Sequence, residues 1–136
     1  MKDTPCIGTR WFEEVWNQRK RETIYELLAP DSVAHSASSS RDLVGPEAWE
    51  QMQQEVLSRL PDMHVTIEDV VSTPENTVVR WTATGSPNEH DKVNFAGTTW
   101  LRIKDGKIVE GWDAWDQTGF VQTLARTGSA PSALVS

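Results

Sequence analysis

Three carboxylates lie close together near the end of the chain, where they could exchange protons with a ligand. Glu110, Asp113 and Asp116 alternate with two tryptophans, Trp112 and Trp115. Apolar surroundings disfavour the charged form of a carboxyl group, which raises its pKa toward the range useful for proton transfer at neutral pH. A carboxylate that shares a strand face with an indole is therefore a candidate general acid or base.

Two further side chains could act together with such a carboxylate. His35 could orient it, or exchange protons with it or with a substrate oxygen. Arg80 could bind a substrate carboxylate or polarise an enol oxygen. Both have structural alternatives: a hydrogen-bonded histidine, and an arginine paired with Glu68 or Glu110. The three histidines lack ligand spacing, so we expect neither a metal site nor a cofactor.

Hydrophobic periodicity predicts the elements that position these residues. Apolar residues recur at helical spacing in the first half of the chain and then alternate with polar ones, as in half-buried strands. Helices gathered beside consecutive antiparallel strands indicate an α+β fold, a curved sheet wrapped around three helices with an interior apolar pocket. Helices are expected at 9–17, up to Pro30 and at 45–60, a short strand at 31–35, strands at 63–72, 77–85, 92–104 and 107–116, and a last helix with Phe120, Val121 and Leu124.

The Asp105-Gly106 pair is a strong signal for a two-residue hairpin turn. It pairs Lys104 with Lys107, and strict alternation then assigns every later residue to a face. One face, expected to line the pocket, holds Phe95, Thr99, Leu101, Ile103, Ile108, Glu110, Trp112 and Asp116; the other holds Trp100, Val109, Asp113 and Trp115. Asp113 would replace Asp116 in the pocket if the register slipped by one residue. Asp116 could otherwise cap the last helix.

Both faces of this hairpin carry large apolar groups, so the outer face is also expected to be buried against another surface. A second copy of the chain is the simplest cover, and we expect a homodimer through the convex sheet face with Trp100 and Trp115 in or near the interface. On the helices, Trp16 and Trp49 are expected to bind ligand at the inner side of the sheet.

Length and composition limit the classes of function. The 136 residues suffice for one domain, expected at 1–126 with a disordered tail at 127–136. The net charge of -7 argues against nucleic acid and anionic membranes as partners. The single cysteine rules out an intrachain disulfide, and no stretch has the length and apolarity of a membrane span or the form of a signal peptide. We therefore expect a cytoplasmic protein.

Several segments in order along the chain resemble the SnoaL-like polyketide cyclase (ester cyclase) family of the NTF2-like superfamily. They are Trp11 to Asn17, Leu27 to His35, Gly45-Pro46-Glu47, Leu60 to Asp69, Val79 to Gly85 and Asp105 to Gln117, and together they span roughly residues 9 to 126. The resemblance implies an NTF2-like cone with a hydrophobic cavity and no cofactor. It also implies an acid/base residue near the end of the last strand, and Asp116 matches that position best.

The resemblance leads to two hypotheses for function. The first is a cofactor-independent cyclase or isomerase for a small hydrophobic carbonyl compound, such as a polyketide ester, with Asp116 and His35 catalytic and Arg80, Trp112, Glu110, Thr99, Trp16 and Trp49 binding. The second is a non-catalytic ligand-binding domain. It is supported by the loop at 86–90, which is shorter than usual in the family, and by the absence of the histidine that family members usually carry directly after the central strand. A second departure is His35-Ser36-Ala37, where the family usually has His-Asp-Pro. A scaffold whose tryptophans fill the cavity is a third possibility.

Overall fold

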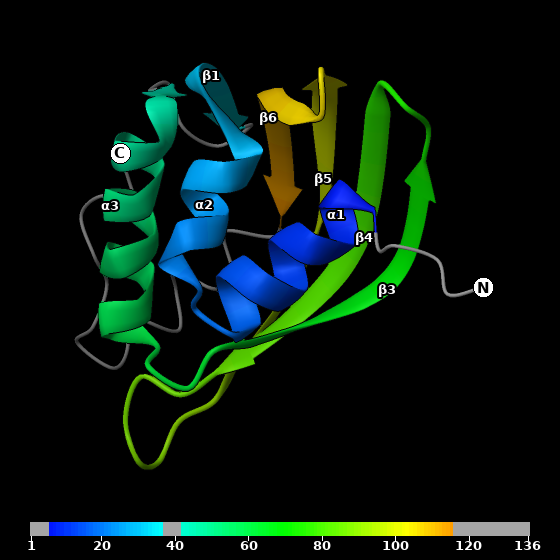
Figure 1. Cartoon of the computed structure of the whole chain (residues 1–136). Helices are drawn as coiled ribbons and strands as arrows, with labels where there is room; N and C mark the ends of the chain where they lie inside the picture. Colours follow the sequence, from blue (N-terminus) through cyan, green and yellow to red (C-terminus); the bar gives the residue numbers. More distant parts are fainter. Residues whose placement is uncertain (1–5, 37–41, 116–136) are drawn as a thin grey trace.

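The computed structural model describes residues 6–36 and 42–115, and these form three helical regions beside one sheet (Figure 1). The predicted α+β arrangement is confirmed. The last predicted helix, with Phe120, Val121 and Leu124, and Asp116 itself lie outside the described residues. The helical elements are α1 (Ile7–Arg10), which continues as the π-helical segment η1 (Trp11–Asn17), α2 (Arg21–Leu27) and α3 (Gly45–Arg59); the strands are β1 (Leu28–Ser36), β2 (Leu43–Val44), β3 (His64–Ser72), β4 (Asn76–Gly85), β5 (Val93–Lys104) and β6 (Lys107–Trp115).

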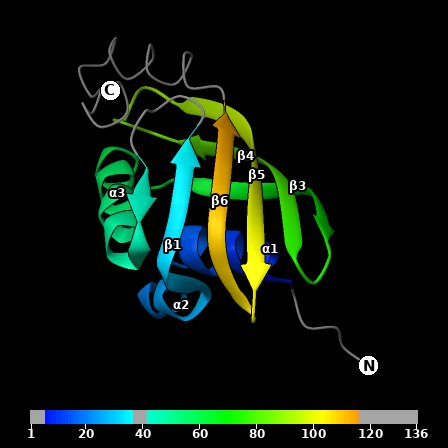
Figure 2. The same ribbon diagram turned by 90° about the horizontal axis from the view of Figure 1, so that it is seen from above.

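The six strands form a single curved sheet in the order β2-β1-β6-β5-β4-β3. All neighbouring pairs are antiparallel except β1 and β6, which run side by side in the same direction (Figure 2). This parallel pair joins the first strand of the chain to the last described one. It thereby connects the helical first half of the chain to the end of the consecutive antiparallel strands β3 to β6. None of the helices in the described ranges has the length and apolarity needed to cross a membrane.

Indoles hold the helices together and against the sheet. The rings of Trp11 and Trp16 both meet Trp49 of α3 edge to face, with centroids 4.6 Å and 5.3 Å apart. The wide turn of η1 directs the Val15 carbonyl toward α3, where the Gln53 amide donates to it at 2.8 Å. The buried stripe that the sequence predicts for these helices is therefore present.

Asn17 connects the end of η1 to the start of the sheet. Its side-chain amide donates to the Val65 carbonyl, and its side-chain oxygen accepts from the Val65 N–H, both at 2.8 Å. This pair of bonds mimics a strand partner at the edge strand β3, which otherwise has a free backbone edge there. The helix end and the sheet edge are thereby held in one relative position.

Three local features differ from the sequence prediction. β1 covers residues 28–36 rather than 31–35, because it pairs with β6 from Leu28 onward. The two-residue β2, where the sequence predicted no strand, pairs with Val33 and Ala34 of β1. The alternation of apolar and polar residues in the sequence loses its phase at Val70-Val71, which predicts a bulge there, but the bulge of β3 lies between Ile67 and Asp69.

A bulge between β5 and β6 has the largest consequence for the site. The turn is as predicted: Asp105 and Gly106 both have positive φ, and Lys104 pairs with Lys107 and Ile103 with Ile108. The next pair is Arg102 with Glu110, so Val109 is an extra residue on β6. All later side chains on β6 therefore point to the face opposite to the one that strict alternation predicts.

At Gly97 of β5, side chains from both neighbouring strands, Trp81 of β4 and Trp115 of β6, approach the backbone closely. A Cβ built there would lie 2.6 Å from Trp115 Cβ, 2.6 Å from Trp81 Cζ2 and 2.9 Å from the Ala114 carbonyl oxygen. A Cβ at Gly111 of β6 would lie farther from its neighbours, 3.2 Å from Leu101 Cδ2 and 3.7 Å from the Trp100 carbonyl oxygen.

Gly97→Ala should therefore destabilise the fold by about 1–3 kcal/mol through overpacking, whereas Gly111→Ala should cost clearly less. Urea unfolding of the two variants and the wild type measures the difference. Equal stabilities of the two variants would contradict the close packing at Gly97.

Candidate functional site

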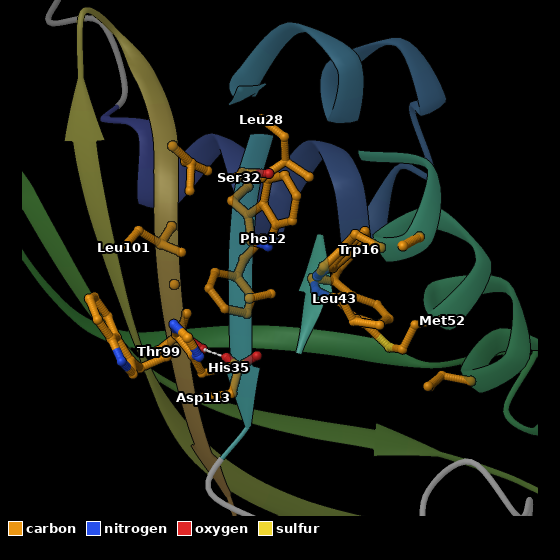
Figure 3. A pocket seen from close by; sticks show the side chains of 18 of the residues that line it. Phe12, Trp16, Leu28, Ser32, His35, Leu43, Met52, Thr99, Leu101 and Asp113 are labelled. Carbon is orange, nitrogen blue, oxygen red and sulfur yellow. Dashed lines mark hydrogen bonds between the residues drawn. The ribbon is translucent and has the colours of Figure 1, made fainter. Parts of the chain in front are cut away.

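A cavity of about 450 Å³ lies between the inner face of the sheet and the helices. Figure 3 shows two of its walls: Thr99, Leu101 and Asp113 on β5 and β6, and Trp16 and Met52 on the helices. Trp49, Trp81, Phe95 and Trp115 also line it. The tryptophans therefore surround the cavity without filling it, which argues against the scaffold hypothesis.

The cavity lining carries little charge. Among its described residues the ionisable side chains are Asp113, Glu55 and His35, and none is lysine or arginine. Within the described ranges, no group of three or more His, Cys, Asp and Glu side chains could hold a metal ion. The polar chemistry of the inner wall is therefore concentrated at Asp113.

Asp113 faces the cavity because of the extra residue at Val109. It pairs across the sheet with Thr99, and the Thr99 hydroxyl donates to Asp113 Oδ1 at 2.5 Å. Burial raises the pKa of the Asp113 carboxyl, and the hydrogen bond from Thr99 lowers it by stabilising the charged form. Burial is the larger of the two effects, so the protonated form persists to a higher pH than in an ordinary aspartate.

The Thr99 hydroxyl is itself held by an indole. Trp81 Nε1 donates to Thr99 Oγ1 at 2.9 Å, and both residues are buried, at 7% and 4% exposure. Trp81 packs between the rings of Phe12 and Phe95, each with its centroid 5.9 Å away. A chain of two hydrogen bonds thus runs from the core to the cavity carboxylate.

The same bulge corrects the predicted faces of β6. Glu110 and Trp112 pair with Arg102 and Trp100, so their side chains lie on the outer face and not beside Thr99. Arg102 confirms this side, because its guanidinium lies 5.0 Å from the Trp112 ring and 3.7 Å from Glu110. Asp113 takes the inner place, as expected for a register slip of one residue.

Trp115 was also assigned to the wrong face. Its ring centroid lies 5.2 Å from that of Phe95, and it belongs to the cavity lining. Phe95, Thr99, Leu101, Ile103 and Ile108 are on the inner side, as predicted.

His35 borders the cavity, but its ring nitrogens are bonded to carboxylates. Nε2 lies 2.7 Å from Glu110 Oε2, and Nδ1 lies 3.0 Å from Asp42 Oδ1. The ring also stacks on Trp112 at a centroid distance of 5.5 Å. The hydrogen bond with Glu110, followed by Asp42, raises the pKa of His35, with burial opposing. The histidine thus fastens β1 to β6 beside the cavity.

The remaining predicted binding residues are divided between the cavity and the surface. Trp16, Trp49 and Thr99 belong to the lining, and Trp112 also borders the cavity although its ring packs against Arg102 and Trp100 on the outer face. Glu110 and Arg80 do not: Arg80 is exposed on β4, at the position that pairs with Asp69 of β3 and Thr98 of β5.

Sequence reasoning missed Trp81 as part of the site. The alternation of buried Val79, Trp81 and Ala83 along β4 could have placed the indole on the inner face. Its hydrogen bond to Thr99 has no comparable sequence signal, because it depends on how β4 and β5 pair.

The raised pKa of Asp113 has a consequence for stability. In the unfolded chain this carboxyl has its ordinary pKa, near 3.9, so between the two pKa values the folded state binds more protons than the unfolded state. Stability is therefore lost as the pH rises through that window. Asp113→Asn should have a higher Tm than the wild type at pH 8, and the difference should shrink toward pH 4. Thermal unfolding monitored by circular dichroism tests this, and a lower Tm of the variant at pH 8 would contradict it.

The fold is shared with known proteins. A protein from Jannaschia sp. CCS1, a candidate SnoaL-like polyketide cyclase, superposes with a TM-score of 0.78 at 20% identity, covering 96% of this chain and 99% of that one. IdmH from Streptomyces antibioticus, a candidate polyketide cyclase, gives 0.74 at 27% identity, with 90% and 96% covered. A candidate polyketide cyclase from Bacillus cereus ATCC 10987 gives 0.77 at 27%, with 88% and 78% covered.

The sequence itself places the chain among these proteins. No protein with a curated description matches it. The sequence pattern of the SnoaL-like polyketide cyclases, however, matches residues 8–124, which is most of the chain. The helices packed inside a curved, unclosed sheet are likewise those of the NTF2-like proteins. The chain belongs to the SnoaL-like polyketide cyclase family.

Proposed function

We propose that the protein is an acid/base enzyme, of the cyclase or isomerase type, that acts on a small hydrophobic carbonyl compound with Asp113 as its proton-transfer group. The observation that carries this proposal is the Asp113 carboxyl group at the wall of an apolar cavity, held by Thr99 and with a pKa raised by burial. Asp113 takes the role that the sequence suggested for Asp116.

The chemistry requires a single base of suitable strength. The ionised Asp113 would remove a proton from the carbon next to a substrate carbonyl, and the resulting enolate carbon would attack a second carbonyl carbon of the same molecule. The protonated Asp113 would then return its proton to the new alkoxide, so that a C–C bond forms with no net change in protons. A raised pKa makes the carboxylate a stronger base, and the indole walls exclude water from the intermediate.

The cavity supports a substrate that is apolar and uncharged. Its volume of about 450 Å³ lies within the range of small-molecule sites, roughly 300–1,000 Å³. The described lining contains two carboxylates, and it contains no lysine or arginine that could pair with an anionic ligand. A neutral ketone or ester fits this lining better than a free carboxylic acid, and the family name is consistent with a polyketide ester.

A non-catalytic ligand-binding domain is the alternative, and the environment of His35 favours it. Proton abstraction next to a carbonyl also needs a donor for the enolate oxygen. His35 is engaged with Glu110 and Asp42, and Arg80 does not line the cavity. On this alternative the cavity would bind an apolar ligand with an affinity that does not depend on Asp113.

Deuterium exchange at carbon separates the two functions. The wild type should accelerate the exchange of α-protons of 2-tetralone or ethyl benzoylacetate in D₂O, followed by proton NMR. Asp113→Asn should lower this rate about 100-fold or more, because general base catalysis contributes that much. Asp105→Asn is the matched control, since it makes the same change in the exposed hairpin turn, where asparagine tolerates the positive φ. Quenching of tryptophan fluorescence by the same compounds without any exchange would support the binding domain.

We also propose that the outer sheet face pairs with a second copy of the chain. Trp100 is 46% exposed there, in the centre of β5, and Trp112 and Arg102 adjoin it. Trp115 faces the cavity and is not part of this surface. Sedimentation velocity should show a dimer for the wild type at micromolar concentration and a shift toward monomer for Trp100→Glu. A wild type that is monomeric at these concentrations would contradict the proposal.

A further inference from the structure

We propose that Trp81 and Thr99 act as positioning residues for Asp113: they hold its Oδ1 and leave Oδ2 as the oxygen that exchanges protons with the ligand. The inference rests on the proposed function, because it assigns the proton transfer to one atom of the same carboxyl group.

The direction of the hydrogen bonds follows from the donors available. An indole N–H can only donate, so Thr99 Oγ1 accepts from Trp81 Nε1. A hydroxyl group has one proton, and the geometry directs it to Asp113 Oδ1 at 2.5 Å. Because the Thr99 oxygen already accepts from Trp81, the rotation of the hydroxyl group is restricted. Its proton therefore points to the carboxylate.

The sheet keeps this chain in place. Trp81 pairs with Gly97 and Thr99 with Asp113, so the three side chains lie on the inner face of three adjacent strands. The Trp81 ring occupies space that is available only because Gly97 has no side chain, since a Cβ there would lie 2.6 Å from Trp81 Cζ2. Phe12 and Phe95 pack against the same ring. The indole N–H therefore has little freedom to turn away from Thr99.

The two oxygens of Asp113 consequently differ. Oδ1 accepts from Thr99, and the described residues offer no hydrogen bond to Oδ2. When Asp113 is protonated, its proton belongs on Oδ2, because Oδ1 already receives the Thr99 proton. Oδ2 is thus the atom that would take a proton from a ligand carbon and return it.

A purely structural role for these bonds predicts a different result. If they only fill space in the core, threonine at 99 could be replaced by the isosteric valine without a change in the ionisation of Asp113. If they position the carboxylate, valine removes a donor to the charged form and raises the pKa of Asp113. The other ionisable groups lining the cavity, His35 on β1 and Glu55 on α3, stay the same in both cases.

The test is an NMR titration of Asp113 in protein labelled with ¹³C at the aspartate carboxyl groups, with the signal assigned by Asp113→Asn. Thr99→Val should raise the midpoint by about one pH unit or more, as expected for the loss of a hydrogen bond to a charged group. Thr99→Ser keeps the hydroxyl and should stay close to the wild type. Thr98→Val is the matched control: it makes the same change one residue away, on the exposed face.

Trp81→Phe removes the indole N–H together with part of the ring, and it should raise the midpoint by less than Thr99→Val does. The proposal is overturned if Thr99→Val has the same midpoint as Thr98→Val, or if Thr99→Ser shifts it as far as Thr99→Val. If Trp81→Phe does not fold, the comparison of Thr99→Ser with Thr99→Val still decides whether the hydroxyl group positions Asp113.

The exchange assay separates this inference from the proposed function. Loss of exchange in Asp113→Asn together with an unshifted midpoint in Thr99→Val would refute the positioning role and leave the enzyme proposal in place. Full exchange in Asp113→Asn together with a shifted midpoint would refute the enzyme proposal, and the hydrogen-bond chain would still control the ionisation of Asp113.

Discussion

The position of one extra residue, Val109, determines what the cavity contains. Without it, β6 would continue to alternate from the Asp105-Gly106 turn, and Glu110 and Trp112 would face the helices. With it, Asp113 and Trp115 face inward and the charged Glu110 lies outside beside Arg102. The bulge changes no side chain, yet it decides which carboxylate faces the cavity and which lies beside Arg102 and His35 on the other face.

The cavity persists because large rings pack against one another around it. Trp11, Trp16 and Trp49 form an edge-to-face group on the helices, and Trp81, Phe95 and Trp115 form a second aromatic group on the sheet. Rings held in this way by neighbouring rings cannot collapse into the empty space as isolated aliphatic side chains could. The same packing fixes the indole N–H that reaches Thr99, so the shape of the cavity and the state of its carboxylate depend on the same side chains.

The sequence predicted the main elements and the turn but not the site in detail. The helical stripes and the alternating strands have strong periodic signals, and Asp105-Gly106 fixed the hairpin correctly. The bulge at Val109 has no such signal, since a β-branched residue suits a regular strand and the following Gly111 could equally be part of one. The faces beyond it were therefore assigned wrongly, and Asp113 stood second to Asp116. The contacts of His35 with Glu110 and Asp42 depend on the parallel pairing of β1 and β6, which joins distant parts of the sequence and leaves no local pattern.

The distribution of charge around the cavity also bears on which compounds could compete for it. Hydrolysis of an ester ligand would yield a carboxylate, and such an anion would meet Asp113 and Glu55 without a lysine or arginine in the described lining to offset them. Like charges in a poorly solvated space repel strongly. The hydrolysed compound would therefore compete weakly with an intact ester for the cavity, even in a solution where spontaneous hydrolysis has produced much of it.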